Sequence, residues 1–495
     1  MIPPIQWAYE VVGVDRSSPP SARNGYPVRE SKCNVVAWSE IREQRAIGVI
    51  RVLKERFAKT AEQAPARQAA PVGPPPSLLG HPMIRTGAWA VSDQTLISGT
   101  NFFTVLLVGR VVAPSDFGMF MLAYTGIWFF QNAQRALIIE PMNVLAAVKD
   151  GCDYRSYVTN TAILQVTFAV MLGGAVIVSG ALVSPAGGLL FALAPAVVFC
   201  QLQEFVRRIF YTRTHVAAAL LIDSISYGGQ AGLLILLYSQ GVLTPVSAMV
   251  AISITSAIAV AVGGWQARSH MIAVLRLRSV WEAAVSNWRF GRWLLGGNFF
   301  RDASGRLYVF LLVAFVGPAG LGAYAAASAL ARVNNVLIQS LETLLPPMAS
   351  RRFKLESQAD MEAFLRSVTL IGVVPGLMSL TLLVVFAEKA LHVAYGGTYD
   401  EFALVLRLVA LSSLLALLSV PLRAAFKAME ETTIMFLAGG LSAVFLVTGG
   451  SVLAAVAGVR GAAWAQVIDT AIVLMILTVA YWGVTRRRAA KNVAV

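Results

Sequence analysis

The sequence has little charge and few of the residues that usually carry catalysis. Only 13% of its 495 residues are charged, whereas about 25% is typical of soluble domains. Four scattered histidines and three cysteines without C-x-x-C spacing indicate neither a zinc site nor a disulfide framework. The motifs G-x-x-x-x-G-K-[ST] and H-E-x-x-H are missing, so neither a phosphate-loop ATPase nor a zinc protease is indicated. We therefore expect no enzymatic activity, no metal and no cofactor.

Long apolar runs are what the sequence does contain. Its residues are 57% hydrophobic and its mean hydropathy is +0.67. Roughly twelve apolar segments follow residue 92, each long enough to cross a bilayer. The expected spans are 92–111, 117–138, 158–182, 187–210, 216–238, 245–265, 293–316, 320–344, 367–387, 402–421, 433–457 and 462–484. The prediction is an all-α integral membrane protein with about twelve transmembrane helices.

The net charge of +14 follows from the way basic residues are distributed. Alternate connections are rich in basic residues: Lys149, Arg155, Arg207, Arg208, Arg213, Arg268, Arg276, Arg278, Arg289, Arg351, Arg352, Lys354, Arg423 and Lys427. The other connections, including 317–320 and 388–401, carry almost no basic residues. Basic loops stay in the cytoplasm, so both termini are expected there. The basic excess is then explained by topology and anionic lipid, and no nucleic-acid partner is expected.

The first 82 residues differ in composition from the rest. They are rich in proline, and no apolar signal-peptide core follows the start. We expect a disordered or interfacial extension, with a candidate amphipathic helix at 38–57. The connection 266–292 divides the remainder, which gives a six-helix N-lobe at 83–285 and a six-helix C-lobe with a basic tail at 286–495.

An internal repeat supports this division. The run Gly-Thr-Asn-Phe-Phe at 99–103 has a counterpart, Gly-Gly-Asn-Phe-Phe, at 296–300. Downstream, Pro114 and Gly118 in the first copy correspond to Pro318 and Gly322 in the second. Two parallel copies with the same orientation are typical of transporters whose substrate passes between the halves.

Charged residues inside the predicted seventh and eighth spans are the strongest site candidates. Asp302 and Arg306 lie four residues apart on one helical face, and Arg332 falls at a similar depth in the next span. Intramembrane charge is expensive, and guanidinium groups in excess over carboxylates suit an anionic phosphate-bearing substrate. The predicted substrate-binding residues are Arg301, Asp302, Arg306, Arg332, Asn298 and Asn335. The alternative is that Asp302 and Arg306 form a neutralised ion pair that holds two helices together and does not bind substrate.

Further charged residues are candidates for coupling or for lining a cavity. Asp223 and Asp469 lie deep enough in their spans to pair with an arginine or to carry a coupling proton. Arg135 lies near the inner end of its span, where a local ion pair with Glu140 is an equal possibility. Asp93 and Arg110 fall at the two ends of the first span, so we expect them at the membrane interface.

The repeated segments resemble a known family. The segments 108–120 and 316–324, with a Pro/Gly turn between the first two spans, are similar to polysaccharide-export flippases of the Wzx/O-antigen type. The polar seventh span and the Arg-x-x-Phe pairs at 207–210 and 423–426 also fit this pattern. These flippases belong to the multidrug/oligosaccharidyl-lipid/polysaccharide exporter superfamily. The resemblance covers about residues 85–485 and leaves out the amino-terminal extension.

The resemblance implies two lobes around a central cavity that opens alternately to each side. It also implies a polyprenyl-diphosphate-linked oligosaccharide as the substrate, the bacterial inner membrane as the location, and the lipid bilayer and other polysaccharide-assembly membrane proteins as partners. Arg301, Arg306 and Arg332 stand where the family tends to place cavity-lining bases. Two alternatives remain open, a multidrug cation exporter of the same superfamily and a membrane-embedded glycan polymerase. The first would need a carboxylate-rich cavity, and the second would need longer outer loops.

Overall fold

The computed structural model describes a helical protein, and the all-α prediction is confirmed. The residues described are 82–146, 149, 151–182, 187–213, 215–271, 277–298, 304–332, 335–355, 357–429 and 431–493, and none of these forms a strand. The chain separates into two units, 1–73 and 74–495, and every described residue belongs to the second unit. The predicted amino-terminal extension and its candidate helix at 38–57 lie outside the described residues.

The first group of helices, here called the N-bundle, extends from residue 82 to residue 270. Its elements are α2 (Pro82–Val111), α3 (Pro114–Gln134), η3 (Arg135–Ile139), α4 (Glu140–Leu145), α5 (Gly151–Leu182), α6 (Gly187–Thr212), α7 (Val216–Asp223), η4 (Ser224–Gly228), α8 (Gly229–Ser239), α9 (Pro245–Ala267) and η5 (Arg268–His270). Helix α6 packs against α3, α5 and α9. It therefore forms the centre of this bundle.

The second group, the C-bundle, follows a connecting helix, α10 (Leu277–Asn298). Its elements are α11 (Ser304–Ala331), α12 (Asn335–Leu355), α13 (Gln358–Val385), α14 (Ala387–Tyr395), η8 (Asp400–Phe402), α15 (Ala403–Ala428), α16 (Thr432–Phe445), η9 (Leu446–Gly450) and α17 (Ser451–Val493). Helix α15 packs against α12, α13 and α17. It occupies the place in this bundle that α6 occupies in the first.

Several helices are long and apolar enough to cross a membrane, so this is a multi-pass membrane protein. Seven helices of the described residues qualify, or eight if the bent pair 374–385 and 387–395, which turns by 78°, forms one span. The predicted loops 317–320 and 458–461 are tight turns between two helices, at Gly317 (φ 71°) within α11 and at Gly458 (φ 60°) within α17. A Cβ atom added to Gly461 would lie 1.9 Å from the carbonyl oxygen of Leu453, so the chain doubles back there. Glycine tolerates these positive φ angles, which lets the backbone turn this sharply. The predicted count of twelve spans stays a prediction.

Two connections that the sequence suggested as loops contain helices. All but the first residue of α14 (Ala387–Tyr395) falls within the expected loop 388–401, and the helix ends at Gly396 in the left-handed conformation. The expected connection 266–292 contains most of α10, which continues to Asn298 and so enters the predicted seventh span. Both are short or amphipathic, and a search for long apolar runs passes over such helices.

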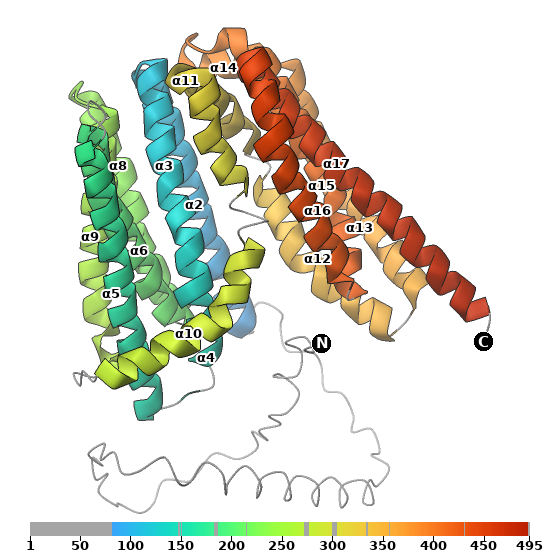
Figure 1. Cartoon of the computed structure of the whole chain (residues 1–495), viewed down its shortest axis with the longest axis horizontal. Helices are drawn as coiled ribbons and strands as arrows, with labels where there is room; N and C mark the ends of the chain where they lie inside the picture. The colour runs from blue at the N-terminus through green and yellow to red at the C-terminus, as the bar shows by residue number, and fades with distance from the viewer. Residues whose placement is uncertain are drawn as a thin grey trace, which may run out of the picture. The chain divides into compact units, whose positions relative to one another are not determined.

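The two bundles meet at the end of the molecule where α14 lies, here called the α14 end (Figure 1). The Pro/Gly pairs of the internal repeat form this contact. A Cβ atom added to Gly118 would lie 1.8 Å from the carbonyl oxygen of Pro318, and one added to Gly322 would lie 2.3 Å from that of Pro114. Only glycine allows two backbones to approach this closely. The repeated motifs therefore pack directly against each other.

Aromatic and polar contacts complete the junction at the α14 end. The ring of Phe117 in α3 lies 6.4 Å from that of Tyr395 and 6.1 Å from that of Tyr399. Arg110 at the end of α2 donates a hydrogen bond of 3.3 Å to the carbonyl oxygen of Val393. Phe117, Tyr395 and Tyr399 are almost completely buried. The opposite end, where α10 lies, is here called the α10 end.

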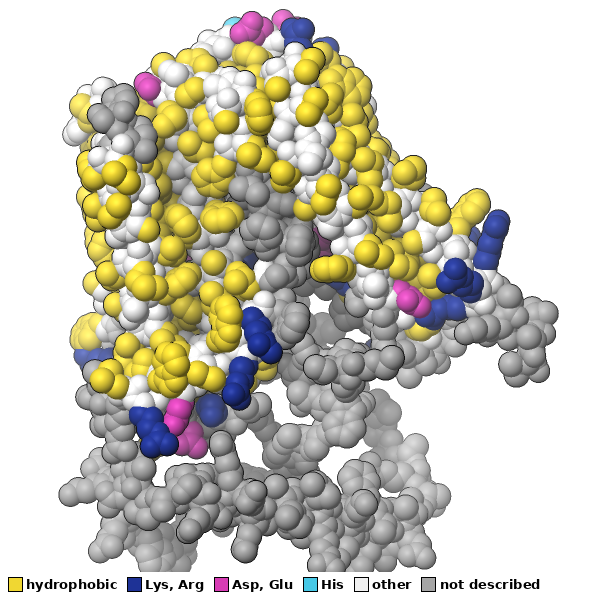
Figure 2. Space-filling model, in the orientation of Figure 1, with side chains coloured by type: hydrophobic (Ala, Val, Ile, Leu, Met, Phe, Trp, Pro, Cys, Tyr) yellow, Lys and Arg dark blue, Asp and Glu magenta, His cyan; other side chains and the backbone are white. Residues whose placement is uncertain are grey.

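The flanks of both bundles are apolar on the outside, as Figure 2 shows. Large hydrophobic side chains are well exposed there, for example Val170 (57%), Met171 (62%) and Val178 (59%) on α5. Exposed apolar surface of this extent would be costly in water. These flanks therefore face lipid.

Candidate functional site

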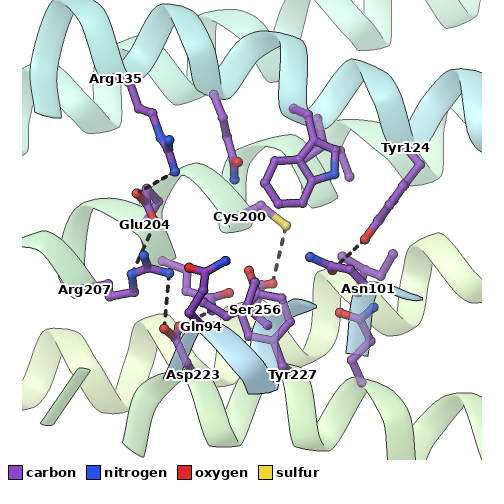
Figure 3. A pocket seen from close by; sticks show the side chains of 17 residues that line it. Gln94, Asn101, Tyr124, Arg135, Cys200, Glu204, Arg207, Asp223, Tyr227 and Ser256 are labelled. Carbon is purple, nitrogen blue, oxygen red and sulfur yellow. Dashed lines mark hydrogen bonds and ion pairs between the residues drawn. The ribbon is translucent and has the colours of Figure 1, made fainter. Parts of the chain in front are cut away.

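A polar pocket lies inside the N-bundle, about midway along its helices. It holds about 710 Å³ of space outside atoms, including its open side. Its polar and ionisable lining residues are Gln94, Asn101, Tyr124, Gln131, Arg135, Cys200, Gln203, Glu204, Arg207, Asp223, Tyr227, Gln230 and Ser256. They come from α2, α3, η3, α6, η4, α7, α8 and α9. Figure 3 shows these side chains pointing toward one another.

Glu204 on α6 is the centre of a buried charge cluster. Its carboxylate lies 2.8 Å from Nη2 of Arg208, 3.5 Å from Nε of Arg207 and 3.7 Å from Nη2 of Arg135. Residues 204, 207 and 208 share one helical face because they are three and four residues apart. Arg135 reaches the cluster from η3, and its side chain is 44% exposed. One carboxylate therefore organises three guanidinium groups from two elements.

Asp223 at the end of α7 extends the cluster. Its Oδ2 atom lies 3.3 Å from Nη1 of Arg207, and its Oδ1 atom accepts a hydrogen bond of 3.0 Å from Gln203. Gln203 in turn accepts a hydrogen bond of 2.8 Å from Ser226. Asp223 is fully buried. Every polar atom of its carboxyl group thus has a partner from α6.

Asp93 on α2 is a second buried acid beside Asp223 and Arg207. Its Oδ2 atom accepts a hydrogen bond of 2.7 Å from Tyr211, whereas its Oδ1 atom has no hydrogen-bond partner within the described residues. Asp93 is 2% exposed. Its expected depth at the membrane interface stays a prediction, but its side chain packs inside the protein. Helix α2 begins at Pro82, so Asp93 lies well inside the helix.

Two π-helical turns adjoin the pocket. η3 begins with Arg135, and η4 begins directly after Asp223. Pro141 follows η3 and has no N–H to return to the carbonyl of Leu137, which favours a wider turn there. A π-helical turn shifts the helical register, so it re-aims the side chains on either side of it, and such turns are frequent at functional sites.

The part of the pocket nearer the α14 end is uncharged and contains aromatic rings and amides. Tyr124 donates a hydrogen bond of 2.7 Å to Asn101, and its ring lies 6.4 Å from the indole of Trp128. Gln230 donates a hydrogen bond of 2.8 Å to Thr104. Cys200 lies 3.5 Å from the hydroxyl of Ser256. Flat rings beside amides make a surface that suits the faces and hydroxyl groups of sugars.

Arg332 of the C-bundle lies near this pocket, although it is not one of the residues that line it. It follows the last residue of α11, and it is exposed. It lies within electrostatic range of Tyr124 in the N-bundle and of Tyr324 and Tyr395 in the C-bundle. None of the ion pairs among the described residues includes Arg332. A positive group thus stands between the two bundles beside the aromatic part of the pocket.

Asp469 belongs to a separate polar group in the C-bundle. It is 8% exposed, and its Oδ1 atom has no hydrogen-bond partner within the described residues. Nearby, Tyr324 hydrogen-bonds to Gln466, and Tyr308 donates a hydrogen bond of 3.2 Å to the carbonyl oxygen of Gly450 at the end of η9. Asp469 does not line the N-bundle pocket. The structure therefore keeps Asp223 and Asp469 in different bundles.

The other predicted substrate-binding residues lie at the edge of what the structure describes. Arg301 and Asp302 fall outside the described residues. Asn298 ends α10, Arg306 lies in the first turn of α11 and Asn335 begins α12, but their side chains are not among those described. Their predicted contacts with a substrate stay predictions. Arg135 and Asp223 line the pocket together, although they have different ion partners.

Sequence reasoning missed Glu204 and misassigned Arg207. The pattern placed Arg207 among basic residues of a loop, but it lies inside α6 with 8% of its surface exposed. The signal that points to both residues is the spacing Glu204-x-x-Arg207-Arg208 at the end of an apolar segment. A carboxylate at that spacing neutralises the bases within one helical face.

Comparisons with known proteins agree on the fold. A multidrug resistance MATE family transporter of the MOP superfamily in an inward-facing conformation aligns with a TM-score of 0.64 and 15% identity, over 81% of this chain and 96% of that one. The lipid II flippase MurJ in an inward closed conformation aligns with a TM-score of 0.63 and 13% identity, over 80% of this chain and 87% of that one. A MOP superfamily transporter from Pyrococcus furiosus, whose title reports a binding pocket of reverse polarity, aligns with a TM-score of 0.55 and 14% identity, over 83% and 96%.

No curated protein matches the sequence. The family model described as polysaccharide biosynthesis protein matches residues 157–404, which is half of the chain. This match and the shared fold confirm the resemblance to polysaccharide-export proteins of the MOP superfamily that the repeated Pro/Gly segments suggested. The chain is a multi-pass membrane protein with the MOP transporter fold, and it belongs to the polysaccharide biosynthesis protein family.

Proposed function

We propose that this protein is a transporter that flips polyprenyl-diphosphate-linked oligosaccharide units across the bacterial inner membrane. The polar head crosses between an N-lobe (83–285) and a C-lobe (286–495), while the polyprenyl tail stays in lipid. Family membership and fold support a transporter of surface-polysaccharide precursors. The observation that carries the proposal is the charge balance of the pocket, taken up next.

The carboxylates of the pocket are already paired with arginines. Glu204 is surrounded by Arg135, Arg207 and Arg208, and Asp223 is paired with Arg207. A cationic drug needs carboxylates that are free to bind it, and this pocket presents none that lacks an arginine neighbour among its described lining residues. Arg332 adds positive charge at the aromatic side. An anionic head group fits this balance better than a cation does, which disfavours the multidrug exporter.

The proposed contacts follow from chemistry. Arg332, together with Arg301 and Arg306, binds the diphosphate, because planar guanidinium groups match phosphate oxygens in bidentate geometry. Asp302, Asn298 and Asn335 are the proposed neighbours that orient these groups. Tyr124 and Trp128 stack on sugar rings, and the amides of Asn101 and Gln131 hydrogen-bond to sugar hydroxyls.

The acid pair in the N-bundle is the proposed coupling device. Asp93 and Asp223 are both buried around Arg207, whose Nη1 atom lies 3.3 Å from Asp223. We propose that one of these two acids carries the coupling proton, because buried acids in membrane proteins are typical of proton relays. Binding or losing this proton changes the charge beside Arg207 and so the packing of α2 against α6 and α7.

The proposal is tested by replacing Arg332 in cells that depend on this chain for surface glycan. Arg332→Ala removes a charge-assisted contact worth about 1.5–3 kcal/mol, so we expect export to fall by about tenfold or more. Arg332→Lys keeps the positive charge but loses the planar guanidinium that binds phosphate through two donors, so it should recover only part of the activity. Arg460→Ala, an exposed arginine on α17, is the control. Normal export by Arg332→Ala at an equal membrane level contradicts the diphosphate role.

A further inference from the structure

The helix between the bundles, α10 (Leu277–Asn298), has two different faces. One face packs on the N-bundle, where it contacts η3, α4 and α5 at the α10 end (Figure 1). On this face Asn287 is 3% exposed and accepts a hydrogen bond of 2.7 Å from the hydroxyl of Tyr157. A Cβ atom on Gly291 would lie 2.4 Å from the carbonyl oxygen of Ala136 in η3. The inner face is thus held tightly against the turn that begins with Arg135.

The opposite face of α10 exposes large apolar side chains. Leu277, Trp281 and Trp288 are 81%, 71% and 53% exposed. The two tryptophans are seven residues apart, so they point in nearly the same direction. Arg278 and Arg289 are also exposed and lie on the strip next to them. Indole rings beside bases are typical of a helix that lies in a membrane interface.

A second element repeats this combination at the same end. Trp265 near the end of α9 is 63% exposed, and the guanidinium of Arg268 lies 4.5 Å from its ring centroid. Arg155 near the start of α5 is exposed too. Exposed tryptophan and arginine side chains from α9 and α10 therefore lie together at the α10 end. Bases at that level attract anionic lipid head groups.

We propose that α10 is a binding surface for anionic phospholipid. Trp281 and Trp288 insert below the phosphates of the membrane leaflet that meets the α10 end, and Arg278 and Arg289 bind those phosphates. The bases on α10 are complementary in charge to lipid phosphates. The Trp265–Arg268 pair on α9 repeats the same pattern at the same end, which favours a lipid surface over a protein partner bound to α10 alone.

Lipid bound there also supports the pocket. The inner face of α10 holds η3 through Gly291 and Ala136, and η3 carries Arg135, which lies 3.7 Å from Glu204. Fixing α10 in the leaflet restricts η3 and keeps Arg135 in place. The stability of the whole protein should therefore depend on anionic lipid.

The first experiment measures depth. The full-length protein, with its three native cysteines replaced by serine, receives a spin label at Trp288→Cys or at Ser286→Cys. Ser286 is also exposed, but it points away from Trp288 because it lies two residues along the helix. In bilayer nanodiscs we expect the label at 288 to be accessible to oxygen and shielded from a water-soluble nickel chelate, with the reverse at 286. Equal exposure of both labels to the chelate overturns the insertion and would leave a protein partner as the occupant.

The second experiment tests the lipid charge. Wild-type protein should have a higher Tm in nanodiscs with 30% phosphatidylglycerol, roughly the anionic content of a bacterial membrane, than in phosphatidylcholine alone. The double variant Arg278→Glu/Arg289→Glu should lose most of this increment, whereas Arg460→Glu on α17 should keep it. An increment that the double variant retains in full contradicts the proposal. The Tm measurement involves no transport substrate, so its result is independent of the proposed function.

Discussion

The two bundles share a fold but handle buried charge in different ways. The N-bundle holds a closed group of ion pairs around Glu204, whose side chain is 9% exposed. The ion pairs described in the C-bundle are peripheral, such as Arg423–Glu342 with side chains 29% and 35% exposed. Among the described residues of the C-bundle, the buried acid Asp469 lies near Tyr308 and Tyr324 and forms no ion pair. In our account, buried acids in the N-bundle couple transport to proton movement, while arginines of the C-bundle bind the substrate.

Removing the centre of the N-bundle cluster should have the largest effect. Glu204→Ala leaves Arg135, Arg207 and Arg208 without their shared partner. Breaking a buried group of this kind costs about 3–5 kcal/mol of stability. Thermal unfolding in detergent would measure it. Glu282→Ala, which removes a pair on the exposed face of α10, should cost less than about 1 kcal/mol. Similar losses for the two variants would mean that the cluster does not hold the N-bundle together.

The junction of the two bundles gives the next prediction. Gly118→Leu places a side chain where even a Cβ atom would lie 1.8 Å from the carbonyl oxygen of Pro318. The α14 end can then no longer close, so cysteines placed in the junction should react with a polar thiol reagent from that side, and export should fall by about tenfold or more. Gly439→Ala has open space around its Cβ position and serves as the control. An unreactive junction in Gly118→Leu would show that this contact is not a gate.

Asp223 and Asp469 should differ in what they do to coupling. Asp223→Asn removes the buried carboxylate that pairs with Arg207 beside Asp93, so export should lose its dependence on an imposed pH gradient. Asp469→Asn lies in the other bundle and should change the rate by about twofold or less, because Asp469 takes part in none of the ion pairs described. Glycolipid flipping in proteoliposomes, with and without the gradient, would measure both. Gradient dependence that survives in Asp223→Asn and disappears in Asp469→Asn would reverse the assignment.

Most of the fold could be predicted because a helix that crosses lipid needs about 20 consecutive apolar residues. Apolar runs long enough to span identified helices such as α5, α6 and α9 near their expected positions. The pairing of Pro114 and Gly118 with Pro318 and Gly322 indicated a repeat, although only coordinates reveal that the two motifs touch. Helices α10 and α14 were missed because their length and amphipathic pattern are set by an interface, not by the hydrocarbon core.

The site was harder to predict because burial and register decide it. Asp223 and Arg135 were candidates on account of their position in apolar segments, and both line the pocket. Asp93 and Arg207 looked peripheral, since sequence alone did not show that α2 begins well before its apolar run or that α6 is central. The π-helical turns η3 and η4 shift the register next to Arg135 and Asp223. Periodicity does not predict such shifts.

The most direct measurement is flipping of a defined substrate by the purified protein. Proteoliposomes would contain a polyprenyl-diphosphate oligosaccharide with a fluorescent sugar, and an impermeant quencher would report which leaflet it occupies. We predict that the wild-type protein moves it, that Arg332→Ala is slower by about tenfold or more, and that Arg332→Lys is intermediate. A protein that transports a lipophilic cation but leaves the glycolipid in its original leaflet would contradict the account.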